Sequence, residues 1–261
     1  MNKEKIPVER FHWNTPAYAD AFETLLKCSQ ERLPVYGKLE AIFSNYPGDS
    51  KAIDWGAGSG DLTSLLLQHF KHVYAVEPNP TMCDLISARC PGATVFRSSL
   101  IDLIPEERFD IGIISHVLYH IPDYKWGTYI MHAARFLSEQ GTLIVTLKNS
   151  DSDCNKMLEH FGAASFDLYA SLETTIRRHK AFDFTFSRVP GGIETQSFED
   201  TLAIARFMFC DRDSDAFSTE PTEADFRAYV RDHFWDEITA SGGWPYDVVF
   251  CLIKRNPLFG S

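Results

Sequence analysis

Short apolar runs alternate with segments of helical periodicity between Lys51 and Leu147. Strands that are buried on both faces of a parallel sheet are typically such runs, and these lie at residues 52–53, 73–76, 94–96, 109–115 and 142–147. Between the runs, apolar residues recur at a spacing that places them on one face of a helix; the first set is Leu62, Leu65, Leu66 and Phe70. This alternation predicts an α/β fold with a doubly wound, mostly parallel sheet.

Turn and cap residues mark the ends of the predicted helices. Asn79 and Pro80 supply an N-cap and a first-turn proline, which together are typical of a helix start. Pro91 and Gly92 end that helix. Gly141 is expected to turn the chain into the fifth strand, after a helical stripe that consists of Trp126, Ile130, Ala133 and Leu137.

The segments on either side of this core also contain predicted elements. Residues 1–48 are expected to form a helical lid, with apolar stripes within 17–25 and 36–43. In the less regular C-terminal third, strands are expected at 182–189 and 246–253 and helices at 201–209 and 223–233. These strands bring the predicted sheet to seven. The predicted domains are therefore the lid (1–48) and an α/β domain with C-terminal helical insertions that cover the substrate (49–261).

Charge and composition narrow the choice of partner. The formal net charge of −11 and the isoelectric point near 5.2 argue against nucleic acid, because nucleic-acid binding relies on clustered Lys and Arg. We expect a small-molecule substrate instead.

The six cysteines contain no C-x-x-C pair, so we expect reduced thiols and no metal site. No apolar leader or membrane-length run is visible, so we expect a cytoplasmic protein with no membrane partner. The oligomeric state is not indicated.

Residues 54–60, with the sequence DWGAGSG, form the strongest candidate for a ligand site. Glycines at a strand-to-helix turn let the backbone approach a ligand closely, because no Cβ intervenes. The dinucleotide fingerprint is G-x-G-x-x-G, whereas the spacing here is G-x-G-x-G and Asp61 stands at the helix start. Carboxylates at Asp54 and Asp61 would repel a pyrophosphate and attract an ammonium or a sulfonium. The local charge therefore favours S-adenosylmethionine over a dinucleotide.

Glu77 adds a second signal, because it ends the second predicted strand, 17 positions after Gly60. A carboxylate at that place can accept hydrogen bonds from both hydroxyls of a ribose. The alternative interpretation is a tight turn followed by a surface glutamate. The strand, the glycine loop, the following helix and Glu77 together favour a nucleoside-containing cofactor.

These motifs resemble those of class I S-adenosylmethionine-dependent methyltransferases over residues 50–148. Residues 54–60 match the first motif and 76–78 the acidic end of the second strand, while 109–120 and 137–144 resemble the fourth motif and the turn into the fifth strand. Serines replace the usual aspartate at the adenine contact. The resemblance implies S-adenosylmethionine as cofactor and the following cofactor-binding residues: Trp13, Tyr18, Asp54, Gly56, Gly58, Glu77, Met82, Ser99, Leu100 and Ser115.

The flanks more specifically resemble histamine N-methyltransferase-like proteins, through residues 18–22 and Glu31. In that family a glutamate near this place contacts the amine substrate, and the fourth motif lines the substrate site. The resemblance therefore implies Glu31, His116 and His120 as catalytic residues. It implies Tyr119 and Asp247 as substrate contacts.

Methyl transfer from a sulfonium is an in-line displacement, so the enzyme mainly has to hold the nucleophile close to the methyl group and exclude water. A base is needed only when the acceptor must lose a proton, and histidine suits that role near neutral pH. Simpler roles are open as well: His116 could cap its loop, His120 could face solvent, and Glu31 could be a surface residue. Phe11, Trp13 and Tyr18 could close over the sulfonium by cation–π attraction or simply pack in the lid.

The function expected first is transfer of a methyl group from S-adenosylmethionine to nitrogen, or alternatively oxygen, of a small metabolite. A second hypothesis keeps the cofactor and changes the reaction: the aminobutyrate arm of S-adenosylmethionine cyclises to azetidine-2-carboxylate and releases methylthioadenosine. A third is a binding module without catalysis. The products formed from S-adenosylmethionine alone separate the three.

Overall fold

The computed structural model describes residues 6–10, 15–210, 217 and 221–256, and its contacts divide the chain into two compact units. The core unit comprises residues 36–147, 168–188 and 249–261, and the flanking unit comprises residues 1–35, 148–167 and 189–248. Residues 36–48, which the sequence analysis assigned to the lid, group with the core unit. The division into a lid and an α/β domain at residue 48 stays a prediction.

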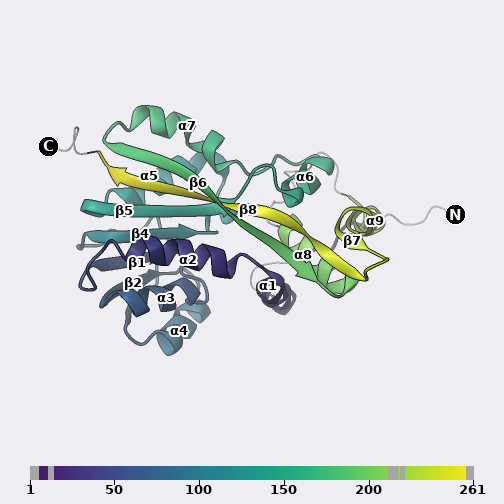
Figure 1. Ribbon diagram of the computed structural model, residues 1–261, viewed down its shortest axis with the longest axis horizontal. Helices are drawn as coiled ribbons and strands as arrows, with labels where there is room; N and C mark the ends of the chain where they lie inside the picture. Colours follow the sequence, from purple (N-terminus) through teal and green to yellow (C-terminus); the bar gives the residue numbers. More distant parts are fainter. Residues whose placement is uncertain (1–5, 11–14, 211–216, 218–220, 257–261) are drawn as a thin grey trace. The chain divides into compact units, whose positions relative to one another are not determined.

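The sheet has the order β3-β2-β1-β4-β5-β8-β6, with β7 paired to β8 outside this path (Figure 1). The predicted α/β fold with seven strands in one doubly wound sheet is confirmed, and β7 is a short addition. β1 pairs in parallel with β2 and β4, β2 with β3, and β4 with β5. The strands are β1 (Lys51–Trp55), β2 (His72–Val76), β3 (Ala93–Phe96), β4 (Phe109–Ser115), β5 (Leu137–Lys148), β6 (Phe182–Thr195), β7 (Trp235–Asp236) and β8 (Ser241–Arg255).

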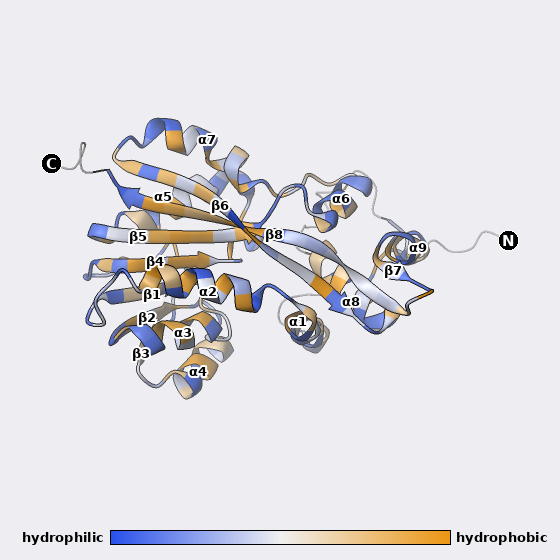
Figure 2. Cartoon of the chain, viewed as in Figure 1, coloured by the Kyte–Doolittle hydropathy of each residue, from blue (hydrophilic) through white to orange (hydrophobic). Residues whose placement is uncertain are grey.

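The central strands are buried on both faces, as their continuous apolar sequence predicts. Ile111, Ile113 and Ile114 of β4 have no exposed surface, and Leu143 and Val145 of β5 have none. Figure 2 shows the same apolar colouring along β4 and β5. Because these strands are parallel, the carboxyl ends of β1, β2 and β4 meet at one edge of the sheet, where open α/β sheets bind ligands.

The helices of the core unit start where local sequence supplies a cap. Asn79 accepts a hydrogen bond from Thr81 N and Pro80 opens α4, as the cap pattern predicted. α3 packs on β1 and β2, α4 on β3, and α5 on β4 and α7. The helices are α2 (Arg32–Phe43), which begins in the flanking unit, α3 (Asp61–His69), α4 (Pro80–Arg89), α5 (Trp126–Ala134) and α7 (Leu168–Arg178), with short 3₁₀ turns η1 (Leu118–His120) and η2 (Asp123–Lys125).

The flanking unit contains α1 (Pro16–Cys28), α6 (Asp153–His160), α8 (Phe198–Phe209) and α9 (Glu223–Phe234). Side-chain oxygens cap all four helices, from Thr15, Ser152, Ser197 and Thr222. Aromatic rings pack together in this unit: Phe209 lies against Phe161, the residue after α6, and against Phe226 of α9.

Two local expectations need correction. Leu137 is the first residue of β5 rather than the end of a helical stripe, since α5 ends at Ala134. Gly141 lies within β5, where the pairing with β4 shifts register after Phe109; a Cβ there would lie 2.6 Å from the Phe109 carbonyl oxygen. α6 and α7 have no counterpart among the predicted elements.

Within the described part of the chain, no helix combines the length and the apolar character that crossing a membrane requires. All six cysteines are described and are free thiols, as expected.

Candidate functional site

The glycine loop follows β1 at the ligand-binding edge of the sheet. The amides of Gly56 and Ala57 both donate to the Val76 carbonyl oxygen, at 2.8 and 3.0 Å, which fastens the loop to the end of β2. Gly56, Gly58 and Gly60 have φ angles of 83°, 53° and 83°. Only glycine adopts this left-handed region without strain, so the turn requires the G-x-G-x-G pattern.

Gly56 and Gly58 differ in what surrounds them. A Cβ on Gly56 would lie 2.5 Å from a methyl carbon of Val117, whereas a Cβ on Gly58 would meet no described heavy atom within 4 Å. Gly56 is therefore needed for packing against the segment after β4. Gly58 borders open space, which a ligand can approach along its backbone.

Glu77 occupies the end of β2 beside this loop and is buried. One carboxylate oxygen accepts a hydrogen bond from Gly58 N at 3.0 Å and the other from Asn79 N at 2.8 Å. Two backbone amides thus fix the orientation of the carboxylate. Each oxygen can accept further bonds, so Glu77 can also bind a pair of vicinal hydroxyls.

Asp54 lies inside β1, with 2% of its surface exposed, and accepts a hydrogen bond from Thr63 Oγ1 at 2.7 Å. Burial raises the pKa of Asp54 to about 6, and the Thr63 hydrogen bond opposes this rise. The carboxylate is therefore mostly ionised at neutral pH but poorly solvated. A cation bound nearby would offset that cost.

Asp61 does not supply the free negative charge that the sequence analysis assigned to it. Arg89 of α4 donates to the Asp61 carboxylate at 2.8 Å and to the Ser59 carbonyl oxygen at 2.9 Å. Ser59 Oγ also donates to Asp61, at 3.0 Å. The guanidinium offsets the Asp61 charge, so the local preference for a cation rests on Asp54 and Glu77.

Ser99 and Leu100 follow β3, where the sequence analysis placed the adenine contact. Ser99 Oγ donates to an oxygen of the Asp102 carboxylate at 2.5 Å, and Leu100 is buried. Sequence reasoning missed Asp102, although an acid three residues after Ser99 was a visible signal. Met82, in the first turns of α4, is half-buried.

The segment after β4 carries the residues expected near the methyl acceptor. Ser115 Oγ and Thr146 Oγ1 of the neighbouring β5 share a hydrogen bond of 2.8 Å. His116 has a φ of 55°, donates its amide to the Thr146 carbonyl oxygen, and stacks on Tyr119 with ring centres 5.9 Å apart. His120 is exposed. The structure thus joins His116 with Tyr119 and leaves His120 apart from that stack.

Glu31 lies in the flanking unit and is half-buried. It accepts a hydrogen bond from the Tyr246 hydroxyl at 2.7 Å, and Ser29 Oγ lies 3.2 Å from the same hydroxyl. Asp247, the residue predicted on this strand, is paired with Asn149: the Asp247 amide donates to Asn149 Oδ1, and the Asn149 amide donates to the Asp247 carbonyl oxygen. Sequence reasoning therefore missed Tyr246, one position away, because only the fold brings β8 to residue 31.

Tyr18 belongs to the flanking unit too, where its ring lies 4.9 Å from that of Phe207 in α8. This contact is the helix packing that the sequence analysis weighed as the alternative to cofactor binding. Trp13 and Phe11 lie outside the described residues. Among the described residues, no group of three His, Cys, Asp or Glu side chains is arranged to hold a metal ion.

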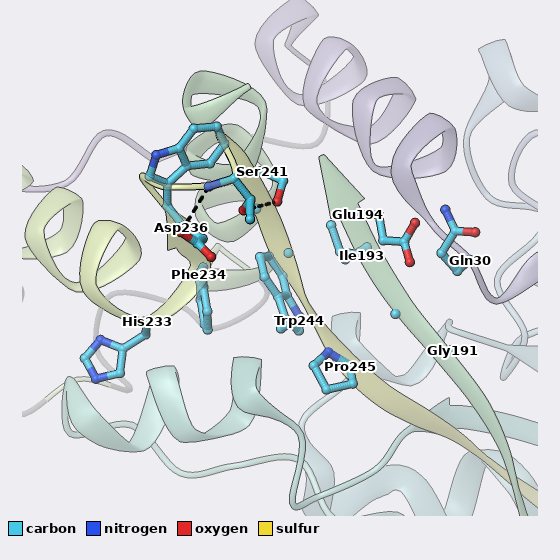
Figure 3. A pocket seen from close by; sticks show the side chains of 15 residues that line it. Gln30, Gly191, Ile193, Glu194, His233, Phe234, Asp236, Ser241, Trp244 and Pro245 are labelled. Atoms are coloured by element: carbon cyan, nitrogen blue, oxygen red, sulfur yellow. Dashed lines mark hydrogen bonds between the residues drawn. The ribbon is translucent and has the colours of Figure 1, made fainter. Parts of the chain in front are cut away.

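The flanking unit also contains a cavity of about 510 Å³ (Figure 3). Its lining includes Gln30, Glu194, Asp236 and the indole of Trp244. Trp244 is buried, and its Nε1 has no hydrogen-bond partner within the described part of the chain. Gln30 and Gly191, which border the Glu31–Tyr246 pair, line the same cavity.

Comparison with known proteins decides the family. The methyltransferase domain profile matches residues 17–184, well over half of the chain. The chain belongs to the methyltransferase domain family. An uncharacterized methyltransferase from Exiguobacterium sibiricum is 25% identical over 95 residues, and one from Bacillus subtilis is 30% identical over 87 residues. These matches cover 36% and 33% of this chain and 44% and 41% of the two relatives, so the chain matches less than half of each relative's length.

Solved structures agree on the methyltransferase fold. The YcgJ protein from Bacillus subtilis superposes with a TM-score of 0.60 at 14% identity, and the match covers 84% of this chain and 98% of that one. Magnesium protoporphyrin IX methyltransferase from Synechocystis, solved with bound S-adenosylhomocysteine, has a TM-score of 0.53 at 13% identity, covering 95% and 90%. At such identities the likeness concerns the fold, which is that of class I methyltransferases.

S-adenosylmethionine is the methyl donor of class I methyltransferases, and residues of the core unit fit it. Gly58 leaves room for a ligand where a Cβ would stand. Hydrogen bonds from the amides of Gly58 and Asn79 orient the neighbouring Glu77 carboxylate. Asp54 contributes negative charge, which suits a cationic cofactor. These carboxylates suit a ribose and a sulfonium better than a pyrophosphate.

Proposed function

We propose that this methyltransferase transfers the methyl group of S-adenosylmethionine to a nitrogen of a small cationic amine. The observation that carries the proposal is the Glu31 carboxylate, held by the Tyr246 hydroxyl at 2.7 Å, because a fixed carboxylate suits an ammonium group. Oxygen is the alternative acceptor atom. The resemblance of residues 18–22 and Glu31 to histamine N-methyltransferase-like proteins supports an amine.

S-adenosylmethionine supplies an activated methyl carbon, so the protein's own groups mainly bind and orient. In this proposal Glu77 accepts hydrogen bonds from the ribose hydroxyls, Gly58 lets the ligand approach the backbone, and Gly56 lets the loop pack against Val117. Ser99, Leu100 and Met82 border the adenine, and Asp54 offsets positive charge. Asp102 assists Ser99 at the adenine, since the two side chains are hydrogen-bonded.

On the acceptor side, Glu31 of the flanking unit binds the ammonium group. Ser115, His116 and Tyr119 are the core-unit residues that the proposal assigns to the methyl-transfer step. His116 is the proposed base, since its strained backbone at the end of β4 holds the ring against Tyr119. Sequence resemblance alone supports a cofactor contact for Tyr18, a catalytic role for His120 and a substrate contact for Asp247. An ammonium acceptor must lose a proton before its nitrogen can attack, and imidazole is suited to accept it.

The experiment uses the full chain and S-adenosylmethionine with a labelled methyl group, first alone and then with an amine library that includes histamine. We expect labelled amine and S-adenosylhomocysteine only when an acceptor is present. Glu77→Ala serves as the inactive control, because it removes the proposed ribose contact. Methylthioadenosine formed without an acceptor would instead support the cyclisation of the aminobutyrate arm and overturn the proposal.

A further inference from the structure

The Glu31–Tyr246 contact depends on how residues 29–31 are attached to β6. Ser29 forms an antiparallel bridge with Ile193, and Gln30 N donates to the Gly192 carbonyl oxygen at 2.9 Å. Glu31 N lies 3.4 Å from Ser29 Oγ. Backbone contacts with β6 therefore fix the backbone that carries Glu31, independently of its side chain.

Gly191 of β6 makes room for the two side chains to meet. A Cβ at this position would lie 3.0 Å from Glu31 Cβ and 3.0 Å from Tyr246 Cε2. Gly191 is not among the residues with positive φ, so its backbone conformation does not require glycine. The close approach of Glu31 and Tyr246 to this position does require glycine. Figure 3 shows Gly191 on its strand with Gln30 beside it and Trp244 and Pro245 on β8.

Tyr246 is a hydrogen-bond donor that does not ionise. Its side chain is 5% exposed, and burial together with the negative charge of Glu31 raises its pKa. The hydroxyl therefore keeps its proton and donates it to the carboxylate. The ammonium of Lys148 lies over the Tyr246 ring, 5.4 Å from its centre.

We propose that Tyr246 and Gly191 are positioning residues that hold Glu31 as an ionised anchor for the ammonium group of the acceptor. A hydrogen bond to the charged form favours ionisation of a carboxylate, so Glu31 attracts the ammonium rather than taking its proton. The pair thereby sets a preference for cationic over neutral acceptors. This inference rests on the proposed function, because it assigns an ammonium group to Glu31.

The test measures binding rather than turnover. The full chain is saturated with S-adenosylhomocysteine, and the affinities of benzylamine and its neutral counterpart benzyl alcohol are measured by calorimetry. The wild type is expected to bind the amine about tenfold more tightly than the alcohol. Tyr246→Phe should lower that ratio about fivefold, in line with the net contribution of one hydrogen bond, and should leave the affinity for the alcohol unchanged.

Two further variants separate positioning from general damage. Gly191→Ala places a methyl group between Glu31 and Tyr246 and should lower the ratio as Tyr246→Phe does. Tyr229→Phe is the control, since it removes another buried tyrosine hydroxyl of the flanking unit. This control should keep the wild-type ratio.

A wild type that binds both probes equally, or neither, overturns the inference. An unchanged ratio in Tyr246→Phe and Gly191→Ala does the same. Failure of the proposed function gives a different result: no labelled amine forms, although the charge preference and its loss in the variants persist.

Discussion

Gly56 and Gly58 stand two residues apart in one loop, yet their surroundings assign them different tasks. Both have positive φ, so any other residue at either position strains the backbone. Only Gly56 would also collide with a neighbour, Val117, whereas Gly58 faces open space. The first glycine serves packing, and we expect the second to serve the ligand.

Gly58→Ala should weaken binding of S-adenosylhomocysteine at least tenfold, because the added methyl group occupies the space that the ligand approaches. The free energy of unfolding should fall by only about 1–2 kcal/mol, the cost of a left-handed non-glycine residue. Calorimetry and urea unfolding measure the two effects. Gly37→Ala is the control, since a Cβ there also meets no described atom within 4 Å; equal losses of affinity in both variants would contradict the assignment.

Asp54 predicts a pH dependence of stability. Its folded-state pKa of about 6 lies above its ordinary value, so the folded protein binds this proton more tightly than the unfolded chain does. The stability that this group contributes is full below about pH 4 and is lost as the pH rises through 6. Asp54→Asn should remove this component, worth up to about 3 kcal/mol. Urea unfolding of the wild type and of Asp54→Asn at pH 4 to 7 measures this component. If the free energy of unfolding changed with pH in the same way in both proteins, the prediction would be refuted.

At the scale of elements, the turn from β4 into η1 stores strain at one residue. His116 has a φ of 55°, a region that costs a non-glycine residue on the order of 1 kcal/mol or more. The turn keeps this conformation because the His116 amide is bonded to β5. Strain of this kind clusters at functional sites.

His116→Gly should therefore raise the free energy of unfolding by about 1 kcal/mol and lower methyl transfer at least tenfold, because the proposed base is lost. His116→Ala keeps the strain and loses the ring, so it should lower activity without stabilising the protein. Thermal unfolding and initial rates give both readings. A fully active His116→Gly would exclude a catalytic role for the ring.

Elements with strong local signals were predictable, and those shaped by their neighbours were not. The predicted strand at 109–115 matches β4, and the Asn79–Pro80 cap starts α4 as expected. α6 and α7 were missed, since their apolar residues are few and bury only one side. The start of β5 at Leu137 was missed because pairing with Phe109 creates it.

On the scale of the whole molecule, the cofactor residues belong to the core unit and Glu31 with Tyr246 to the flanking unit. Each unit has its own buried aromatic and aliphatic residues. Each bound ligand should therefore slow hydrogen exchange at the residues that the proposal assigns to it, whichever unit they belong to.

Hydrogen exchange should show this division. S-adenosylhomocysteine at 100 times its Kd should stabilise the folded protein by about 2.7 kcal/mol and slow exchange at residues 56–60, 77–79 and 98–102. Adding an amine acceptor should extend the slowing to residues 29–31 and 245–247. Mass spectrometry of peptides from the full chain measures both. Amine-dependent slowing in Glu31→Gln equal to that of the wild type would contradict the role of Glu31.

The sequence by itself determined the sheet, the glycine loop and Glu77, because these depend on local signals: buried strands need continuous apolar runs, and left-handed turns need glycine. It also suggested Glu31 by resemblance. Only the tertiary structure decided that Arg89 offsets Asp61 and that Gly191 lets Tyr246 of β8 reach Glu31. Those contacts join residues 28 to 215 positions apart, and no local pattern records a partner at that distance.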